Sequence, residues 1–490
     1  MRKSFSKQLQ FDCVEIKNIQ LNLDCRDEII PILRALQEIY SQPKLRDQIL
    51  ELIAADVNAN SREDLGREGF TYWQILVLAA VKFGCNFDYD KLQDLSEQHR
   101  IQRQMMNIGD WDDKTSFHWR RIRDNLALIM PATIEKISHL IVGYGHQLVP
   151  EAPQQIRADS FVIETDIHYP TESSLIADGL RKMISTMQEL ALMCNLEGWR
   201  QADHLLKQIK KLNRKISRIA SKKGRGYKKK IKREYKKLLR LAKSVVERID
   251  DQGIEIVKRF SIDDPPRLAY AEVLIFLRRT QQVMATAHRR AILGETVPNS
   301  DKVFSVFEPH TQLYRRGKAG EENQFGRLLL VYEDAVGFIV HHHLMDRDVQ
   351  DQDVAVEQSR ILQERMQGRM KSLSFDRGFH SPENQEELKE IVEYVCLPKP
   401  GKKQSVEQDE TEDGIFHTAR QRHSGVESAI GALQKGNGLK RCRDRGEAGF
   451  ERYIALGILG RNLHVLGKVL IAKEAALSAA AHSLRRPIAA

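Results

Sequence analysis

The chain has 490 residues, of which 29% are charged, and its formal net charge at pH 7 is +10. This length is sufficient for two or three domains with cores of their own. No apolar run reaches transmembrane length and the first residues lack a signal-peptide core, so we expect a soluble, intracellular protein that does not enter a membrane. The cysteines contain no C-x-x-C pair, which argues against a zinc knuckle or a disulfide framework and is typical of a reducing cytoplasm. They are Cys13, Cys25, Cys85, Cys194, Cys396 and Cys442.

The first 150 residues are predicted to form a helical domain. Apolar residues recur at spacings of three and four between Asp27 and Ile53, with a break near Pro43. Similar patterns predict helices at 70–83, 89–99 and 116–130. The pattern fits both a helix-turn-helix within 70–128 and an ordinary helical domain. We expect residues 1–150 to form an N-terminal DNA-binding domain.

A change of pattern after Asp159 predicts the first strand. Residues 160–168 are β-branched and aromatic, and the strand is expected to end at Tyr169-Pro170. The helical pattern then returns over 173–300, which we predict to be an insertion after this strand. The last 19 residues, 472–490, are rich in alanine and are expected to fray.

The positive charge of the chain is concentrated in this insertion. Between Lys207 and Lys243 there are 18 lysines and arginines and one acid, Glu234, so the segment carries +17 and leaves −7 for the remainder. Apolar spacing predicts two amphipathic helices joined by a basic tip at Gly224-Arg-Gly226. A solvated helical hairpin and a nucleic-acid contact both fit this pattern, and the near-absence of acids favours nucleic acid.

Strand and helix patterns alternate over the rest of the chain. Strands are predicted at 303–307, 325–332, 336–343, 371–376 and 393–397, the second and third forming a hairpin. Helices are predicted at 354–367, 382–392, 425–434 and 447–470, with a polar loop at 399–414. Without the insertion, this order predicts an α/β fold, an RNase H-like mixed sheet flanked by helices, built from 151–172 and 301–471.

Two aspartates are candidate metal ligands. Asp376 ends a short apolar strand and precedes a glycine turn, and α/β sheets usually carry their chemistry at the carboxyl ends of strands. Asp166 alternates onto one face of the first strand with Val162 and Glu164, where a carboxylate is costly unless it is paired or binds a metal. Asp159 is expected to begin that strand in a turn, and a turn aspartate is the alternative interpretation of Asp376.

Glu427 is the third candidate, with an equally weighted alternative. Ser424-Gly-Val-Glu427 has the form of a capping box, in which the glutamate only closes the start of a helix. The many basic residues around Glu427 favour a site that holds a phosphodiester. Three carboxylates can bind two Mg²⁺ ions, or Mn²⁺ in their place, at the ~3.5–4 Å separation used in two-metal phosphodiester chemistry.

Three blocks of sequence resemble the DDE transposases of bacterial insertion sequences, within the ISNCY-type group. They are Glu164-Thr-Asp-Ile-His-Tyr-Pro-Thr171, Ser374-Phe-Asp-Arg-Gly-Phe-His-Ser-Pro-Glu-Asn384 and Arg420-Gln-Arg-His-Ser-Gly-Val-Glu-Ser-Ala-Ile430. The resemblance covers roughly 155–470 and implies that Asp166, Asp376 and Glu427 form the DDE triad. Related enzymes often carry Tyr, Arg and Lys where this chain has Arg420, His423 and Gln434, with Lys435 one position later.

The resemblance implies nicking of element ends by metal-activated water, followed by strand transfer from the freed 3′-hydroxyl. The expected partners are the terminal inverted repeats and target DNA, bound by a homodimer or larger assembly in the bacterial cytoplasm, on the nucleoid. A metal-dependent nuclease that does not join strands, and a non-catalytic DNA-binding protein derived from a transposase, are the alternatives. The residues expected to contact DNA are Lys222, Lys223, Arg225, Lys228, Lys229, Lys230, Arg315, Arg316, Lys318, Arg377, Arg420, Arg422, His423 and Lys435.

Overall fold

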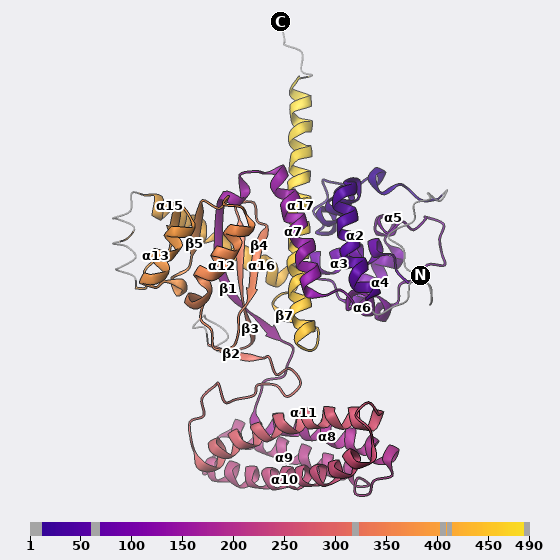
Figure 1. The fold of residues 1–490 in the computed structure, drawn as a ribbon, viewed down its shortest axis with the longest axis vertical. Coiled ribbons are helices and arrows are strands. Elements are labelled where there is room, and N and C mark those ends of the chain that lie inside the picture. Colours follow the sequence, from indigo (N-terminus) through magenta and orange to yellow (C-terminus); the bar gives the residue numbers. More distant parts are fainter. Residues whose placement is uncertain (1–11, 60–68, 316–322, 402–407, 409–413, 485–490) are drawn as a thin grey trace. The chain divides into compact units, whose positions relative to one another are not determined.

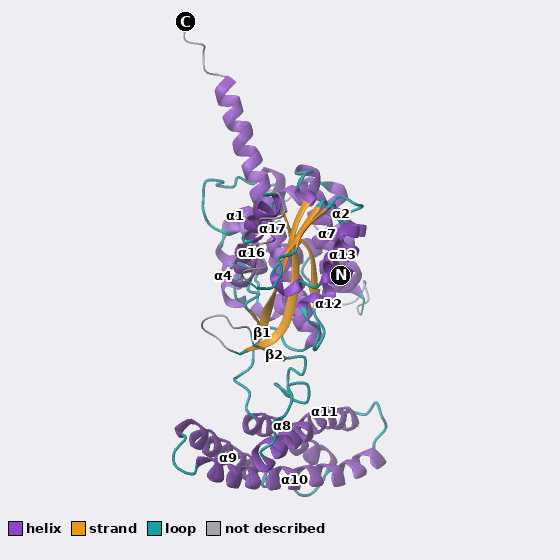
Figure 2. Ribbon diagram, turned by 90° about the vertical axis from the view of Figure 1, so that its left-hand side faces the viewer, coloured by secondary structure: helices purple, strands orange, loops and turns teal. Residues whose placement is uncertain are grey.

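A computed structural model describes residues 12–59, 69–315, 323–401, 408 and 414–484. The chain forms two compact units (Figures 1 and 2). The first unit consists of Met1–Glu164 and Arg327–Ala490, and the second unit is Thr165–Gly326. Within the described residues the fold is mixed α/β, with a helical majority and one open mixed sheet.

The first unit begins with helices, as the apolar spacing predicted. Pro43 is the first residue of its helix, a position that tolerates the missing N–H of proline, so the predicted break separates two helices there. The elements are α1 (Ile29–Ser41), α2 (Pro43–Asn58), α3 (Tyr72–Gly84), α4 (Tyr89–Gln98), α5 (Arg100–Met105), α6 (Trp119–Leu126) and α7 (Pro131–Leu148).

The sheet combines a parallel part with an antiparallel part. Its strand order is β2-β3-β1-β5-β6, with β4 paired to β3 and β7 paired to β1. β1 pairs in parallel with β5, and β5 with β6, whereas β3 and β4 form the predicted antiparallel hairpin. The strands are β1 (Gln155–Thr165), β2 (Gln312–Tyr314), β3 (Gln324–Asp334), β4 (Ile339–Leu344), β5 (Ser372–Phe375), β6 (Tyr394–Cys396) and β7 (Arg441–Cys442).

Helices follow the strands in the second half of the first unit. Those at 354–367, 382–392 and 425–434 were predicted within a few residues of their ends, whereas α15 was not predicted. The elements are α12 (Asp351–Arg365), the short 3₁₀ helix η4 (Arg377–Phe379), α13 (Pro382–Ile391), α15 (Ile415–His423), α16 (Gly425–Lys435) and α17 (Glu447–Leu484).

Three sequence-based predictions of elements were wrong. The first strand covers 155–165 rather than 160–168. No strand forms at 303–307, because this segment packs against the helical bundle of the second unit: Val306 is fully buried there, and its carbonyl accepts a hydrogen bond from Arg279 of α11 (Pro265–Ala287) at 2.8 Å. The tail expected to fray from residue 472 instead continues α17 to Leu484.

α17 is the central helix of the first unit. It packs against α1, α3 and α7 and also touches β4 and β7. Among the described residues it is the only single helix long and apolar enough to cross a membrane, although α6 and α7 together meet the same criterion as a bent pair. Its most apolar stretch is 72% buried inside the protein, as is common for a core helix. A helix covered on several sides needs apolar residues on several faces.

Close packing around α17 depends on small and polar side chains at fixed positions. A Cβ at Gly460 would lie 2.5–2.7 Å from backbone atoms of Phe83 and Gly84, so α3 approaches α17 almost backbone to backbone. Asn462 is fully buried and bonds to both backbone groups of Ile339 in β4, accepting from the N–H at 2.8 Å and donating to the carbonyl at 2.9 Å. Its amide also donates to Ser138 of α7 at 2.8 Å. Asn462 therefore supplies hydrogen-bond partners to backbone groups of β4 that would otherwise be buried without them.

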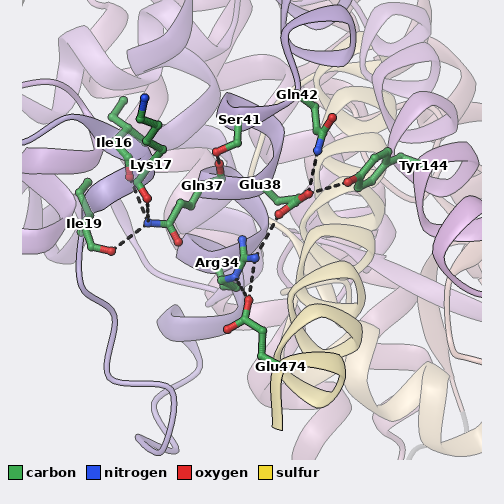
Figure 3. Close-up of polar contacts among 10 residues, drawn as sticks. All are labelled: Ile16, Lys17, Ile19, Arg34, Gln37, Glu38, Ser41, Gln42, Tyr144 and Glu474. Carbon is green, nitrogen blue, oxygen red and sulfur yellow. Dashed lines mark hydrogen bonds and ion pairs between the residues drawn. The ribbon is translucent and has the colours of Figure 1, made fainter. Parts of the chain in front are cut away.

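A polar network ties the N-terminal helix α1 to α7 and α17 (Figure 3). Arg34 contacts Glu38 at 3.1 Å and Glu474 of α17 at 2.7 Å, and the Tyr144 hydroxyl donates to Glu38 at 2.5 Å. Burial acts to raise the pKa of Glu38, but the hydrogen bonds from Tyr144 and Gln42 and the charge of Arg34 outweigh it and hold that pKa below its ordinary value.

The second unit is a four-helix bundle. Its helices are α8 (Glu172–Cys194), α9 (Ala202–Lys222), α10 (Tyr227–Arg259) and α11, followed by a π-helical turn at His288–Leu293. α9 and α10 are the two amphipathic helices expected from the basic segment, and Lys223 and Gly226 in the connection both have positive φ. Their apolar faces join one core with α8 and α11.

We predict that Gly460→Ala destabilises the protein by about 1–3 kcal/mol, because the added methyl group overlaps the backbone of α3. Gly143→Ala is the matched control: Gly143 lies in α7, and a Cβ there meets nothing within 4 Å. That variant should gain about 0.5–1 kcal/mol from the lower flexibility of the unfolded chain. Urea unfolding followed by circular dichroism measures both, and equal losses would contradict the close packing of α3 on α17.

Candidate active site

Asp376 is presented by a rigid turn at the end of β5. Phe375 precedes Asp376 in the sequence and Phe379 follows it. The centres of these two rings are 5.0 Å apart, and both side chains are buried. The side-chain amide of Asn384 donates to the carbonyls of Phe379 at 2.9 Å and Gln352 at 2.8 Å, which fixes the turn against the start of α12. Asp376 Oδ1 accepts the N–H of Arg377 at 2.7 Å, so it does act as a turn aspartate, yet the residue remains exposed to solvent.

Asp159 lies beside Asp376 in the register of the sheet. β1 and β5 are parallel, and Ala158 pairs with Phe375. The next residue on each chain segment is an aspartate, Asp159 on β1 and Asp376 after β5. Directly paired residues of adjacent strands point to the same face of the sheet. The expectation that Asp159 begins the strand in a turn was therefore wrong, since Asp159 is the fifth residue of β1.

Asp166 has a different setting. β1 ends at Thr165, so Asp166 follows the strand in a bend and is exposed, where the sequence had predicted a position within the strand. It belongs to the second unit, whereas Asp159, Asp376 and Glu427 belong to the first. Nearby, His168 contacts Asp178 of α8 at 3.4 Å.

Glu427 does not act as a helix cap in this structure. Ser424 precedes α16 with helical backbone angles and makes no side-chain capping bond; its hydroxyl donates instead to the carbonyl of Gln421 at 2.6 Å. The S-x-x-E sequence thus matches a capping box, but the hydrogen bonds of a capping box do not form. The reason is that α15 runs directly into α16, so Ser424 has a helical rather than an extended backbone conformation. The side chain of Glu427 is exposed.

His423 connects the Asp376 turn with Glu427. Its Nδ1 lies 3.1 Å from the hydroxyl of Ser374, two residues before Asp376. Burial lowers the pKa of His423, and the charge of Asp376, and more weakly that of Glu427, acts in the opposite direction. A single imidazole is therefore within electrostatic reach of both carboxylates.

Arg157 joins the strand that carries Asp159 to the helix pair that carries Glu427. Its Nε donates to Glu333 of β3 at 2.6 Å, and another guanidinium nitrogen donates to the carbonyl of Arg422 in α15 at 3.1 Å. A Cβ at Gly425 would collide with this guanidinium, so the glycine at the start of α16 allows the close approach. Burial raises the pKa of Glu333 against the opposing charges of Arg157 and Arg461. A cavity of about 260 Å³ lies next to these groups, lined in part by Arg157, Ser374 and Arg422.

The carboxylates are not gathered into a ready-made cluster. Within the ranges that the structure describes, no three Asp, Glu, His or Cys side chains are close enough together to hold a metal ion. A fourth acid lies near the Asp376 turn: Asp351, the first residue of α12, accepts the hydroxyl of Ser160 at 2.6 Å and would lie 3.5 Å from a Cβ at Gly378.

Comparison with known protein families identifies the domain that carries this site. Residues 301–463 match the model of a family described as transposase DDE domain. The chain carries a transposase DDE domain. This match supports a DDE transposase of an insertion sequence, as the three sequence blocks predicted. No curated protein and no solved structure matches the chain.

The matched region includes Asp376 and Glu427 but not β1, on which Asp159 lies, or Asp166. Sequence reasoning missed Asp159 because a strand start and a strand interior look alike over so few residues. The sequence signal for Asp159 was its position after Ala158 in a stretch that favours a strand. Only the pairing of β1 with β5 distinguishes Asp159 from Asp166 as the neighbour of Asp376.

The residues that were expected to contact DNA fall into three places in the chain. Six are exposed at the tip between α9 and α10: Lys222, Lys223, Arg225, Lys228, Lys229 and Lys230. Arg377, Arg420, Arg422, His423 and Lys435 lie on η4, α15 and α16, the elements that carry or adjoin Asp376 and Glu427. Arg315 follows β2 and donates to Asn323 at 3.2 Å, while Arg316 and Lys318 lie outside the described residues.

We predict that Ser424→Ala changes the free energy of unfolding by less than about 0.5 kcal/mol, because Ser424 does not cap α16. Ser381→Ala is the matched comparison, since the Ser381 side chain accepts the N–H of Asn384 at 3.0 Å and caps α13. That variant should lose about 1 kcal/mol. Chemical denaturation of both variants measures the difference, and a larger loss at Ser424 would restore the cap interpretation of Glu427.

Proposed function

We propose that this transposase cuts DNA at the ends of its element by attack of water on a phosphodiester and then joins the freed 3′-hydroxyl to target DNA. The observation that carries the proposal is the parallel pairing of β1 with β5, which brings Asp159 level with Asp376 in the sheet. Both steps are attacks of an oxygen on phosphorus, so one set of carboxylates can serve both.

We assign the triad as Asp159, Asp376 and Glu427, with Asp159 in the place that the sequence had suggested for Asp166. Asp159 is held in the interior of a partly buried strand directly beside the Asp376 turn, whereas Asp166 is an exposed residue beyond the end of that strand. Reacting groups need positions fixed by rigid elements, which favours Asp159. The shared influence of Asp376 and Glu427 on His423 supports the other two members.

The strand order supports an RNase H-like catalytic domain. β1 is central, with the antiparallel pair β3 and β4 on one side and the parallel strands β5 and β6 on the other. The helical bundle α8–α11 then interrupts this domain between β1 and β3, in agreement with an insertion after the first strand. In our proposal the N-terminal helices and this bundle supply DNA contacts.

The donor set suits Mg²⁺ or Mn²⁺. Three carboxylates offer the hard oxygen ligands that these ions prefer, and both Asp376 and Glu427 are accessible from solvent. Two bound ions would activate the attacking oxygen and stabilise the leaving oxygen at this position. The 3₁₀ turn and its Asn384 bonds hold the Asp376 carboxylate in place, and Arg157 holds α15, which leads into α16, against β1.

Several cations are available to hold the phosphodiester beside the carboxylates. Arg422 and Lys435 are exposed on α15 and α16, and Arg377 follows Asp376 directly. Guanidinium groups match the geometry of phosphate oxygens in pairs. His423, whose pKa is lowered by burial, is suited to an uncharged hydrogen-bonding role with Ser374.

The basic tip of the bundle is the second proposed DNA contact. Glu234, the acid within the basic segment, is fully buried and pairs with Lys215 at 3.0 Å, Arg233 at 3.2 Å and Lys237 at 3.6 Å. The charge of Glu234 therefore compensates these three cations of the helices. The lysines of the tip are exposed to solvent. Such a surface attracts the phosphate backbone without reading sequence. Because two element ends must be joined to one target, we propose that a dimer or larger assembly binds them.

We expect Asp159→Asn, Asp376→Asn and Glu427→Gln to lower Mg²⁺-dependent cleavage of element-end DNA by a factor on the order of 10³, because each removes a carboxylate from the site. Asp166→Asn is the matched control and should retain cleavage within a few-fold. Gel analysis of an end-labelled duplex carrying the terminal repeat measures all four. Loss of cleavage at Asp166 with retention at Asp159 would overturn the assignment in favour of Asp166.

The same substrates distinguish the alternative functions. Products longer than the substrate, formed when target DNA is added, indicate strand transfer, whereas cleavage alone indicates a nuclease that does not join. Binding without cleavage by the wild-type protein would indicate a DNA-binding protein with an inactive site.

For the basic tip, we predict that Lys228→Gln, Lys229→Gln and Lys230→Gln together reduce the slope of log affinity against log salt by up to about 3, roughly 0.9 for each phosphate that the variant no longer neutralises. Lys243→Gln, an exposed lysine of α10 that pairs with Glu247 at 3.7 Å, is the control and should change the slope little. Fluorescence anisotropy with duplex DNA provides the measurement. An unchanged slope in the triple variant would mean that the tip is only a solvated hairpin.

A further inference from the structure

Four arginines converge on a cavity of the first unit that is distinct from the carboxylate site. The cavity has a volume of about 460 Å³ and lies between α6 and the segment that joins β7 to α17. Arg123 comes from α6, Arg443 and Arg445 come from the joining segment, and Arg452 comes from the first turns of α17. The cavity is therefore formed by parts of the chain more than 300 residues apart in sequence.

The acid at this cavity does not balance the arginines. Asp444 is the carboxylate among the lining residues, against four guanidinium groups. Burial raises the pKa of Asp444, while the charges of Lys82, Arg452 and Arg123 lower it, so this one carboxylate acts on the buried Lys82 as well as on two of the cavity arginines. In the portion of the chain that the structure describes, neither Arg443 nor Arg445 forms an ion pair. Unpaired like charges repel each other, and a bound anion would relieve that repulsion.

The walls of the cavity are held in place by contacts outside it. Arg452 donates to the carbonyl of Ala127, just after α6, at 3.0 Å and so fixes the start of α17 to the end of α6. Arg123 lies over the ring of Trp119 at 5.4 Å and pairs with Asp124 at 2.8 Å. The guanidinium groups are thus presented by two helices that are already attached to each other.

An extended polyanion fits this surface better than a small anion. Arg123 belongs both to the cavity and to α6, and α6 also exposes Arg120 and Arg121. The guanidinium of Arg120 lies 5.1 Å from the centre of the Trp119 ring, and that of Arg121 lies 4.8 Å from the centre of the Phe70 ring. Arg120 and Arg123 are three positions apart on α6, share one face of it and both lie over the Trp119 ring, so exposed guanidinium groups continue from the helix to the cavity and can match successive phosphates of a nucleic-acid strand. Planar guanidinium groups can bind each phosphate through two N–H groups.

We propose that the cavity lined by Arg123, Arg443, Arg445 and Arg452 binds a backbone phosphate of the DNA that the transposase acts on. This proposal rests on the proposed function and names a binding surface that is separate from both the triad and the basic tip. The site positions DNA and does not take part in the chemistry, because its contacts are to phosphate alone.

The test compares two double variants that remove the same number of positive charges. Arg443→Gln/Arg445→Gln removes two exposed arginines of the cavity and leaves Arg452, which has a structural contact. Arg360→Gln/Lys389→Gln is the matched control: both residues are exposed on α12 and α13, and they pair with Glu387 at 3.7 Å and Glu386 at 3.8 Å. Binding is followed by fluorescence anisotropy without divalent metal, over a series of salt concentrations, using a duplex with the terminal repeat and an unrelated duplex of equal length.

We expect the cavity variant to bind both duplexes roughly tenfold more weakly at low salt and to reduce the salt slope by about 1–2, with little change in the control variant. Arg443→Lys/Arg445→Lys should restore the salt slope, since the charges return. A salt slope equal to that of the control variant, with an unchanged melting temperature, would overturn this proposal while leaving wild-type cleavage and joining intact. Failure of the wild-type protein to bind or cut either duplex would overturn the proposed function together with it.

Discussion

The pairing of β1 with β5 is the constraint on which the proposed active site depends. A shift of one residue in this register would turn Asp159 to the other face of the sheet and away from Asp376. Buried residues on both strands, among them Ala158 and Phe375, hold the register because any slip would expose them. Arg157 of the same strand donates a hydrogen bond to the carbonyl of Arg422 in α15. The position of α15, and of Glu427 in the helix that follows it, therefore depends on the strand that carries Asp159.

A second constraint comes from α17, which unites the N-terminal helices with the sheet. Gly460 lets α3 approach closely, and Asn462 satisfies the backbone of β4. The first turns of the same helix place Arg452 at the arginine cavity. The helix that stabilises the first unit thereby also brings α6 beside the β7–α17 segment, and a core contact becomes the basis of a proposed DNA surface.

The charge of the chain is organised more finely than its net value suggests. The basic segment contains one acid, Glu234, which is buried and pairs with three cations of the helices. Its negative charge therefore does not neutralise the lysines of the tip. At the arginine cavity, Asp444 is one carboxylate beside four arginines, and it also acts electrostatically on the buried Lys82. In the basic segment, the position of one buried carboxylate therefore decides where positive charge is available to phosphate. A composition-based argument alone would have found only the first of these surfaces.

The sequence by itself determined most elements and the resemblance to DDE transposases, because apolar spacing and the Asp376-Arg-Gly-Phe379 block are local features of the chain. It predicted the α9–α10 hairpin, the β3–β4 hairpin and the strand that ends at Asp376. Only the tertiary structure decided which aspartate stands beside Asp376, since strand register is set by packing between residues more than 200 positions apart. Tertiary structure also decided the role of Ser424: its sequence matches a capping box, but α15 ends directly before it and the capping hydrogen bonds do not form. Likewise, Arg123 and Arg445 line the same cavity only in the folded protein.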